Sequence, residues 1–398
     1  MVIEMDKEKL TIYWPDTSCM DIEEVKFCRF FCKEKSMSMS AGESLDLYWI
    51  DYDPGISIEK LLSQNNASLI LVVTDPEILL SYTAIMSMVR CVKKIGYATG
   101  PVYNLTDYSN QQADILTPYL NITSLQEIIS EFYTKETFCH EVKMLDPSCI
   151  IYPLDYFDRL PSSKIQCSFL DFAKMDFPKN VDRAALVHRF GDYYEGERAD
   201  LIELIPQDVK EVLDVGCAQG GYGRRLKSVR ADISIIGVEM NHTMAVKAQQ
   251  YYDHVFVGKL EDISFERNID LINCGDVVEH LYNPWGMLNK LHTLLKIRGN
   301  LVLSVPNIGH WSIVRDLLKG RFEYVPVGLL CISHIRWFTE QSIKKALKDA
   351  GFEIDIFKRQ QLPPTKSGKE FVRSMVREKW ADENSLLTNE FIIRAKKI

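Results

Sequence analysis

The stretch Val212–Gly221 (VLDVGCAQGG) constrains the fold of this chain most strongly. Its apolar first half predicts a buried strand, and its glycine-rich second half predicts a tight turn into a helix over Tyr222–Val229. A second strand, Ile233–Val238, is followed directly by Glu239. Glycines allow a ligand to approach the backbone, the helix start offers free N–H groups, and a carboxylate at the tip of the second strand can accept both hydroxyls of a ribose. We therefore expect a ligand that contains a nucleoside.

The composition predicts an ordinary globular protein with two domains. The chain has 398 residues, which is long for a single core, and 46% of them are hydrophobic while 26% are charged. The net charge of −8 gives no basic field for nucleic acid or an anionic membrane, so neither is expected as a partner. The longest apolar runs, such as Leu69–Val73, are of strand length and too short for a membrane span.

The cysteines and the amino-terminal residues favour a cytoplasmic location. The start of the sequence lacks the basic and apolar regions of a signal peptide. Ten cysteines occur without a Cys-x-x-Cys pair, so we expect reduced thiols and neither a disulfide framework nor a zinc ribbon.

Strands and helices are expected to alternate through the C-terminal part, which predicts an open, mostly parallel sheet covered on both faces. The expected elements after Glu239 are helix 243–252, strands 254–257 and 269–274, helix 284–295, strand 300–305, helix 340–350 and strands 352–358 and 390–397. A helical cap over residues 181–205 is expected to precede them.

The N-terminal part predicts a smaller α/β domain over residues 1–150, joined by a linker over 151–180 to the domain of residues 181–398. The expected strands are 10–14, 25–31, 45–50 and 69–74, followed by a helix over 77–95 and a turn at Gly100-Pro101. The function of this domain is not assigned from the sequence.

Several ordered motifs in the C-terminal half carry a resemblance to a known family. They are Tyr193-Tyr194 with Arg198, Val212–Cys217, Gly237–Glu239, Gly275-Asp-Val-Val-Glu-His-Leu281 with Asn283-Pro-Trp285, Ser304–Asn307, and Gly328–Thr339. In this order and spacing they resemble the class I S-adenosylmethionine-dependent methyltransferases, and most closely a branch from bacterial polysaccharide gene clusters. The resemblance implies a Rossmann-like, seven-stranded sheet.

The resemblance also implies the cofactor, S-adenosyl-L-methionine, and the residues around it. Ala218 stands where a dinucleotide-binding turn has its middle glycine, which suits a ligand without a pyrophosphate. Glu239 would hold the ribose, Met240 would pack against adenine, and the segment with Leu260 and Glu261 would border the adenine amino group. The remaining expected contacts are Asp214, Gly216, Cys217, Gly220, Tyr222, Gly275 and Asp276.

Methyl transfer to a hydroxyl needs a base for the proton, and Asp276-x-x-Glu279-His280 follows the fourth strand, at the edge where ligands bind. We expect His280 to be this base, with capping of the next helix by Glu279 and His280 as the structural alternative. In ubiquinone-biosynthesis O-methyltransferases an acid-x-x-Glu-His sequence at this position can hold a divalent metal. Oxygen ligands with one imidazole suit magnesium or manganese poorly to moderately, so no metal site is expected here.

Further candidates lie after the fifth strand. Asn307 and His310 are expected to line the acceptor side, and His334 and Arg336 could orient a hydroxyl, a phosphate or a sugar acid, or simply hold their loop. The aromatic residues Trp311, Tyr324 and Trp337 could stack on a sugar or belong to the core. The expected acceptor is a sugar, a glycan or another small molecule.

Two alternatives remain for the whole chain. Asp75, or Asp51 with Asp53, could hold a metal-diphosphate in a glycosyltransferase-like N-terminal domain, although both sequences also suit ordinary turns. The second alternative is a cofactor-binding scaffold without catalysis, which Ala218, Lys259 and Cys331 keep open as departures from the family pattern.

Overall fold

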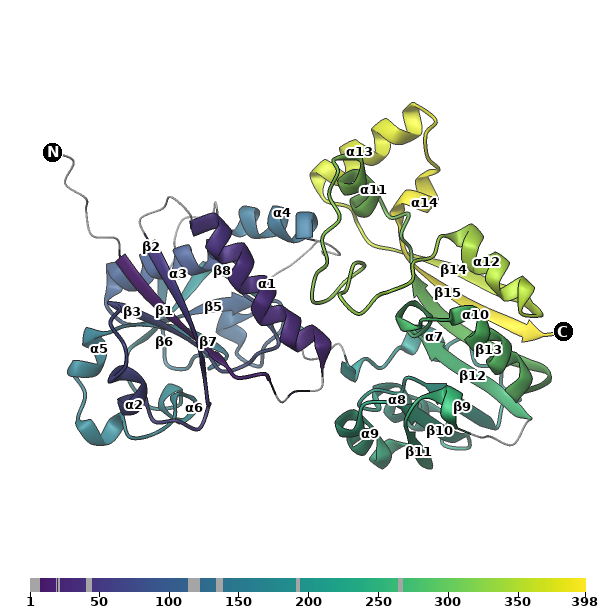
Figure 1. Cartoon of the computed structure of the whole chain (residues 1–398), viewed down its shortest axis with the longest axis horizontal. Helices are drawn as coiled ribbons and strands as arrows, with labels where there is room; N and C mark the ends of the chain where they lie inside the picture. The colour runs from purple at the N-terminus through teal and green to yellow at the C-terminus, as the bar shows by residue number, and fades with distance from the viewer. Residues whose placement is uncertain are drawn as a thin grey trace. The chain divides into compact units, whose positions relative to one another are not determined.

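The chain folds into two compact units, Met1–Phe190 and Gly191–Ile398 (Figure 1). The structure is a computed structural model that describes residues 8–18, 20, 22–40, 45–113, 122–133, 139–190, 194–263 and 268–398. Within these ranges, no helix has both the length and the apolar character that crossing a bilayer requires. Tyr193, which belongs to one of the family motifs, lies outside the described residues.

The C-terminal unit contains the expected seven-stranded sheet, in the order β11-β10-β9-β12-β13-β15-β14. Its strands are β9 (Glu211–Val215), β10 (Ser234–Glu239), β11 (His254–Val257), β12 (Ile269–Gly275), β13 (Leu295–Pro306), β14 (Phe352–Gln361) and β15 (Thr388–Lys397). The first five in the sheet order run parallel, and β15 is antiparallel to both β13 and β14. The carboxyl ends of β9, β10, β12 and β13 therefore meet at one edge, where ligands bind in sheets of this kind.

Helices cover both faces of this sheet: α7 (Ala199–Ile202), α8 (Gly221–Val229) and α9 (His242–Ala248) pack on one face, and α10 (Pro284–Leu294) and α12 (Glu340–Asp349) on the other. Three further helices, α11 (Trp311–Leu318), α13 (Lys366–Arg377) and α14 (Glu383–Leu387), pack on one another around a separate small core. Successive strand residues point to opposite faces, so Val212 packs with Leu226 of α8 whereas Leu213 packs in the cluster that contains Leu288 of α10 and Leu347 of α12. Burial of each such side chain stabilises the fold by about 1.5–3 kcal/mol.

The N-terminal unit is built on a second mixed sheet, in the order β2-β1-β3-β7-β5-β8-β4, with β6 paired to β8. Its strands are β1 (Glu8–Pro15), β2 (Leu45–Tyr52), β3 (Leu69–Val73), β4 (Ile78–Leu79), β5 (Ala98–Tyr103), β6 (Cys139–Val142), β7 (Cys149–Pro153) and β8 (Lys179–Arg189). Its helices are α1 (Glu23–Ser40), α2 (Ile58–Leu62), α3 (Tyr82–Ile95), α4 (Ile122–Tyr133), α5 (Asp155–Asp158) and α6 (Phe169–Ala173). This confirms the α/β class of the region.

The structure places the domain boundary later than the sequence suggested. The expected linker 151–180 contains β7, α5 and α6, whose apolar residues pack inside the N-terminal unit. The expected cap helix over 181–205 is wrong, because residues 179–189 form strand β8, which pairs with β4, β5 and β6. The alanines at 184 and 185 favour a helix locally, but pairing with three strands overrides that preference.

Two local predictions in the N-terminal unit are also wrong, and the helix predicted over 77–95 is confirmed only from Tyr82 to Ile95. Residues 25–31 lie in helix α1 because the buried side chains of Val25, Cys28, Phe31 and Cys32 repeat every three to four residues. The segment 77–95 contains the short strand β4 before helix α3. Gly100-Pro101 lies inside β5, where the pairing register with β8 shifts, so a strand irregularity replaces the expected turn.

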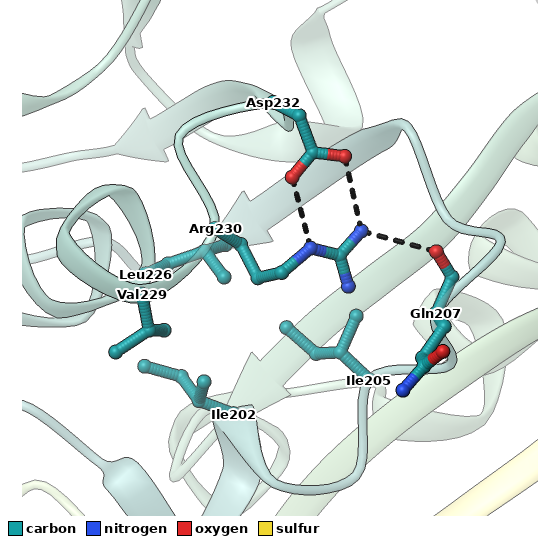
Figure 2. Close-up of a pocket in the computed structure, with 7 residues that line it drawn as sticks. All are labelled: Ile202, Ile205, Gln207, Leu226, Val229, Arg230 and Asp232. Atoms are coloured by element: carbon teal, nitrogen blue, oxygen red, sulfur yellow. Dashed lines mark hydrogen bonds and ion pairs between the residues drawn. The ribbon is translucent and has the colours of Figure 1, made fainter.

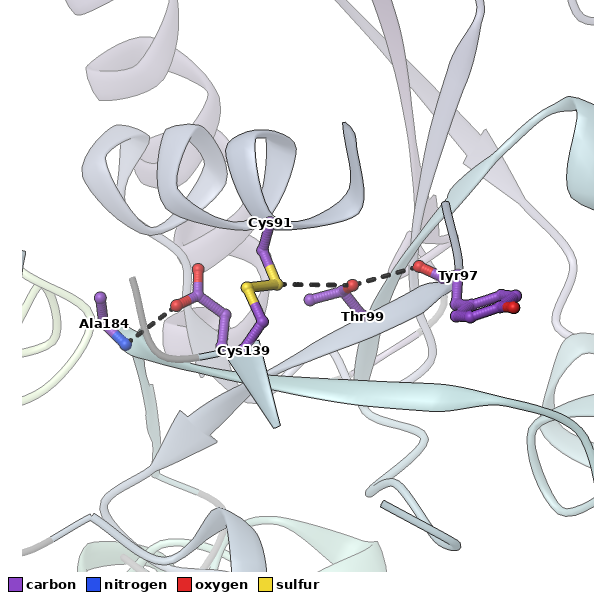
Figure 3. The surroundings of a disulfide bond; sticks show 6 residues. Cys91, Tyr97, Thr99, Cys139 and Ala184 are labelled. Carbon is purple, nitrogen blue, oxygen red and sulfur yellow. Dashed lines mark hydrogen bonds between the residues drawn. A yellow bond between two sulfur atoms is a disulfide. The ribbon is translucent and has the colours of Figure 1, made fainter. Parts of the chain in front are cut away.

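Cys91 and Cys139 form a disulfide, which corrects the expectation that all thiols are reduced (Figure 3). Helix α3 and strand β6 bring the two Cα atoms to 6.2 Å, within the range that a disulfide spans. The Thr99 hydroxyl lies 3.9 Å from Cys91 Sγ and donates to the carbonyl of Tyr97 (Figure 3). The two cysteines are 48 residues apart, so nothing in their local sequence indicates the pairing.

Candidate functional site

The turn after β9 has the backbone geometry of a ligand-binding loop. Gly216 and Gly220 have φ angles of 76° and 94°, and Ala218 also lies in the left-handed region at 44°. A Cβ at Gly216 would stand 2.7 Å from Cγ2 of Val277, so a side chain there is excluded by both sterics and conformation. The turn leads into α8, whose first N–H groups point toward the carboxyl edge of the sheet.

Glu239 at the end of β10 is tied to this turn. One of its carboxylate oxygens accepts from the N–H of Ala218 at 2.9 Å, and the other accepts from the N–H of Asn241 at 2.8 Å. Burial raises the pKa of Glu239, and these backbone bonds oppose the rise. Each oxygen keeps a second lone pair, so the carboxylate can still accept from a diol.

Asp214, in β9, is connected through hydrogen bonds to the residues around the glycine turn. Its oxygens accept from the Tyr252 hydroxyl at 2.5 Å and from the Asn273 amide at 2.7 Å, and its side chain is buried. Burial raises the pKa of Asp214 to about 6. The Tyr252 hydroxyl also accepts from the N–H of Gly223 at 3.1 Å, which connects Asp214 to the start of α8. No local pattern indicates Tyr252 or Asn273 as partners of Asp214, because both are distant from it in the chain.

The other expected cofactor residues divide by burial. Cys217, Tyr222 and Leu260 have side chains in the hydrophobic cores, so any cofactor contact that they make is through the backbone. Met240, directly after β10, and Glu261, in the short 3-10 helix Leu260–Asp262 after β11, are both exposed, and Met240 is 72% exposed although it is apolar. An exposed methionine directly after Glu239 suits a flat apolar ligand such as adenine.

Gly275 and Asp276 lie at the carboxyl end of β12, beside Arg198, which was not expected to contact the cofactor. Arg198 forms an ion pair with Asp276 and donates to Asp200 at 2.9 Å, Glu390 at 2.8 Å and Ser304 at 3.1 Å. Burial and the neighbouring Asp276 raise the pKa of Glu390 to about 8, against the opposing charge of Arg198. One cation thus serves three carboxyl groups at this edge.

Glu279, His280 and His334 gather next to this network. Glu279 and His280 lie in a short 3-10 helix, Val278–His280, and the Glu279 carbonyl accepts from the N–H groups of Ile335 and Arg336, each at 2.9 Å. The rings of His280 and His334 are 4.8 Å apart and almost perpendicular. Burial, followed by the charge of Asp276, raises the pKa of Glu279 well above its usual range. The structure therefore unites two histidines that are far apart in the sequence.

His310 and Asn307 do not join that cluster. His310 caps α11 with Nδ1 2.8 Å from the Ser312 hydroxyl, and burial lowers its pKa to about 3. The Asn307 amide donates to the carbonyls of Ser385 and Thr388, and its oxygen accepts from Gly309. Both side chains hold the segment after β13 in place, so a direct role for either in proton transfer is not supported.

The aromatic candidates also separate. Trp311 is buried under helices α13 and α14, with the Arg315 guanidinium 4.7 Å from its ring centroid, so it belongs to a core. Tyr324 and Trp337 form a partly exposed cluster with Phe322, with ring centroids 5.6–6.3 Å apart. Of the expected sugar-stacking residues, only this pair is accessible.

The carboxylates proposed for a diphosphate in the N-terminal unit are engaged by protein groups. Asp75 accepts from Arg189 Nε at 3.0 Å and from the N–H of Glu77 at 2.9 Å. Asp51 forms an ion pair with Arg29, and Asp53 accepts from the N–H of Gly55 at 2.9 Å. These contacts favour the turn interpretation of both sequences.

A cavity of about 400 Å³ in the C-terminal unit is lined by residues of α7, of α8 and of the segments that follow these two helices (Figure 2). Ile202, Ile205, Leu226 and Val229 form its apolar lining, and the paired Arg230 and Asp232 lie at its rim (Figure 2). Asp232 lies two residues before β10, so the cavity is near the amino end of that strand, away from the expected cofactor contacts at its carboxyl end.

Comparison with known proteins agrees with this geometry. Residues 185–355 match the family model described as "Methyltransferase domain". A Mycolicibacterium smegmatis protein named "Probable S-adenosylmethionine-dependent methyltransferase" is 24% identical over 151 residues, which cover 37% of this chain and 53% of that protein. The mitochondrial ubiquinone biosynthesis O-methyltransferase of Schizosaccharomyces pombe is 28% identical over 130 residues, or 30% and 47% of the two chains. The present chain thus spans about half the length of these relatives.

A crystal structure of a S-adenosylmethionine-dependent methyltransferase from Archaeoglobus fulgidus aligns over 52% of this chain and 98% of its own length, with 19% identity and a TM-score of 0.37. The family match, the strand order and the glycine turn together define the class. The C-terminal half is a class I S-adenosylmethionine-dependent methyltransferase domain, a class whose cofactor is S-adenosylmethionine. The match begins within β8, so it overlaps the end of the N-terminal unit.

Proposed function

We propose that this protein transfers a methyl group from S-adenosylmethionine to a hydroxyl of a sugar, a glycan or another small molecule. The observation that carries the proposal is the joining of Glu239 to the left-handed turn at Gly216–Gly220, through the N–H of Ala218. It fixes a carboxylate at a strand tip beside a helix start, as a nucleoside ligand requires.

The proposed cofactor contacts follow from exposure and free lone pairs. Glu239 would accept from the ribose hydroxyls, and the exposed Met240 would cover the adenine. Asp276 directly follows β12, where its carboxylate, shared with Arg198, would favour the ammonium group of the cofactor's amino-acid moiety. When bound, the cofactor supplies an electrophilic methyl group, and its sulfonium becomes a neutral thioether as the methyl leaves.

His280 is the base that we assign to accept the proton of the acceptor hydroxyl. Its Nδ1 lies 3.2 Å from the Ser333 carbonyl, which can only accept, so Nδ1 carries a proton and Nε2 keeps the lone pair. The imidazole is partly exposed, unlike the buried His310. A base of this kind contributes about 10²–10⁴-fold to a proton-transfer step.

The sugar acceptor rests on the resemblance to polysaccharide-cluster enzymes and on the accessible pair Tyr324 and Trp337. Flat aromatic faces contact the C–H faces of sugar rings while leaving the hydroxyl groups free. These residues belong to the segment that also carries His334 and Arg336. We place the proposed reaction in the cytoplasm.

Calorimetry with S-adenosylhomocysteine and a labelled-methyl assay test the proposal. Wild type should bind the nucleoside, and Glu239→Ala should weaken binding by about 10- to 100-fold, as expected for loss of charged hydrogen bonds. Glu203→Ala, at an exposed glutamate beside α7, is the matched control and should bind normally. A panel of sugars and amines would then report whether label enters oxygen or nitrogen. Unchanged binding in Glu239→Ala contradicts the assignment, and binding without transfer to any acceptor favours the scaffold alternative.

A further inference from the structure

One cluster beside the proposed site has the chemistry of metal ligands. Glu279, His280 and His334 each offer one ligand atom, and these atoms all lie within 4.8 Å of one another. Two imidazoles and one carboxylate form a ligand set that suits zinc and other late divalent transition metals. Magnesium and calcium prefer oxygen ligands and do not suit it.

Both histidines are oriented as metal-binding histidines commonly are. His280 Nδ1 lies 3.2 Å from the carbonyl oxygen of Ser333, and His334 Nδ1 lies 3.1 Å from that of Leu329. Because a carbonyl cannot donate, each Nδ1 carries the proton and each Nε2 presents a lone pair. A backbone carbonyl that fixes the tautomer and the ring orientation is a frequent partner of a histidine ligand.

Glu279 supplies the independent observation. Its side chain is 1% exposed, and among the residues that the structure describes neither carboxylate oxygen has a hydrogen-bond partner. The nearby cation, Arg198, is already bonded to Asp200, Asp276 and Glu390. A buried carboxylate without partners is costly, and a bound cation would remove that cost.

We propose that Glu279, His280 and His334 bind one divalent transition-metal ion, with zinc as the best match. Asp276 is excluded from the ligand set because Arg198 and Ser304 hold its two oxygens. Ligand atoms about 2.0–2.1 Å from a tetrahedral zinc ion are roughly 3.3 Å from one another. Side-chain rotations that move the three ligand atoms by about an ångström would therefore bring them to binding distance. The fourth position is left for a ligand from outside the cluster.

This site deepens the proposed function but does not depend on it for binding. With an ion bound, His280 would be a ligand and no longer the base, and the ion would lower the pKa of the acceptor hydroxyl so that its proton could pass to solvent water. Metal binding can be measured without cofactor or acceptor, so a failure of either proposal leaves the other testable.

Cobalt absorbance is the direct measurement. The full chain, metal-free and without an affinity tag, is titrated with Co²⁺ and then with Zn²⁺ as the competitor. We expect one Co²⁺ per chain, displaced by equimolar Zn²⁺ and not by millimolar Mg²⁺. Glu279→Gln and His334→Ala should each lower the affinity by more than about 100-fold, since even loss of an outer partner costs about 10–100-fold.

His254→Gln is the matched control, because this histidine is exposed at the amino end of β11. It should bind Co²⁺ as wild type does. Circular dichroism and S-adenosylhomocysteine calorimetry separate loss of the site from loss of the fold. Absence of saturable Co²⁺ binding to folded wild type overturns the proposal, as does wild-type affinity in both Glu279→Gln and His334→Ala.

Discussion

In each unit an arginine lies among carboxylates at the ends of several strands, which we call the N-terminal edge and the C-terminal edge. The two edges differ in how completely the arginine and the hydrogen bonds compensate the carboxylate charges. In the N-terminal unit Arg189 contacts Asp75 and Asp146, the latter through both terminal nitrogens at 3.1 and 3.2 Å. In the C-terminal unit Arg198 serves Asp200, Asp276 and Glu390.

The pKa values of the buried carboxyl groups are shifted in opposite directions at the two edges. Burial opposes ionisation of Asp146, but hydrogen bonds from Ser148 and Thr106 together with Arg189 lower its pKa overall. Burial instead dominates at Glu390 and Glu279 and raises the pKa of both. The N-terminal edge is therefore a completed structural network, whereas the C-terminal edge has carboxyl groups that a positive ligand would stabilise, which is a mark of functional sites.

The largest expected difference is between the effects on turnover of a substitution at the C-terminal edge and one at the N-terminal edge. His280→Ala should lower methyl transfer by about 10²–10⁴-fold, because it removes either the base or a metal ligand. Its affinity for S-adenosylhomocysteine, measured by calorimetry, should stay within about threefold of wild type. His188→Ala, at a half-buried histidine of the N-terminal edge, should leave turnover of the folded protein unchanged. Equal turnover in wild type and His280→Ala would remove the functional distinction.

Asp146→Ala should have the next largest effect, on stability. It removes the acceptor of bonds from Thr106, Ser148 and Arg189, and leaves the guanidinium with less of its compensation. We expect a loss of about 3 kcal/mol from the N-terminal unit. Scanning calorimetry of the full chain, with cofactor affinity as the control, measures it. A loss below about 1 kcal/mol would mean that the network is not structural.

The contributions of Glu390 and Asp146 to the free energy of unfolding should depend on pH with opposite signs. Because the pKa of Glu390 is raised to about 8, its contribution is fully present below its unfolded value near 4.5 and is lost as the pH rises toward 8. Asp146 has a lowered pKa, so its contribution is present above about pH 4 and is lost at lower pH. Glu390→Gln should flatten the decline between pH 5 and 8 in calorimetric scans. An unchanged slope in that variant would contradict this account of the C-terminal edge.

The smallest effect is expected at Asp51. Its ion pair with Arg29 is half exposed, and such pairs contribute about 0–1 kcal/mol. Asp51→Asn should therefore change the unfolding midpoint little and should leave methyl transfer intact. Sugar-nucleotide binding to wild type that disappears in Asp51→Asn would instead restore the glycosyltransferase alternative.

Sequence patterns predicted most of the C-terminal sheet because strands β9, β10 and β12 are short, rich in apolar residues and followed by a turn or helix signal. Strand 254–257 has the predicted bounds, and helices α8, α10 and α12 begin or end within a residue or two of theirs. The N-terminal unit was less predictable. Residues 25–31 have strand-like composition but lie in a helix, and residues 179–189 have helix-favouring alanines but lie in a strand, because partners distant in the chain decide both.

The sequence alone determined the class of the C-terminal domain and the place proposed for its nucleoside site, since a glycine turn and Glu239 act through local backbone geometry. Tertiary structure decided which charged side chains meet. It brought Tyr252 and Asn273 to Asp214, joined Arg198 to Glu390 across 192 residues, and placed His334 beside Glu279 and His280. Contacts of this kind depend on how strands and loops pack across the sheet, and no local pattern records them.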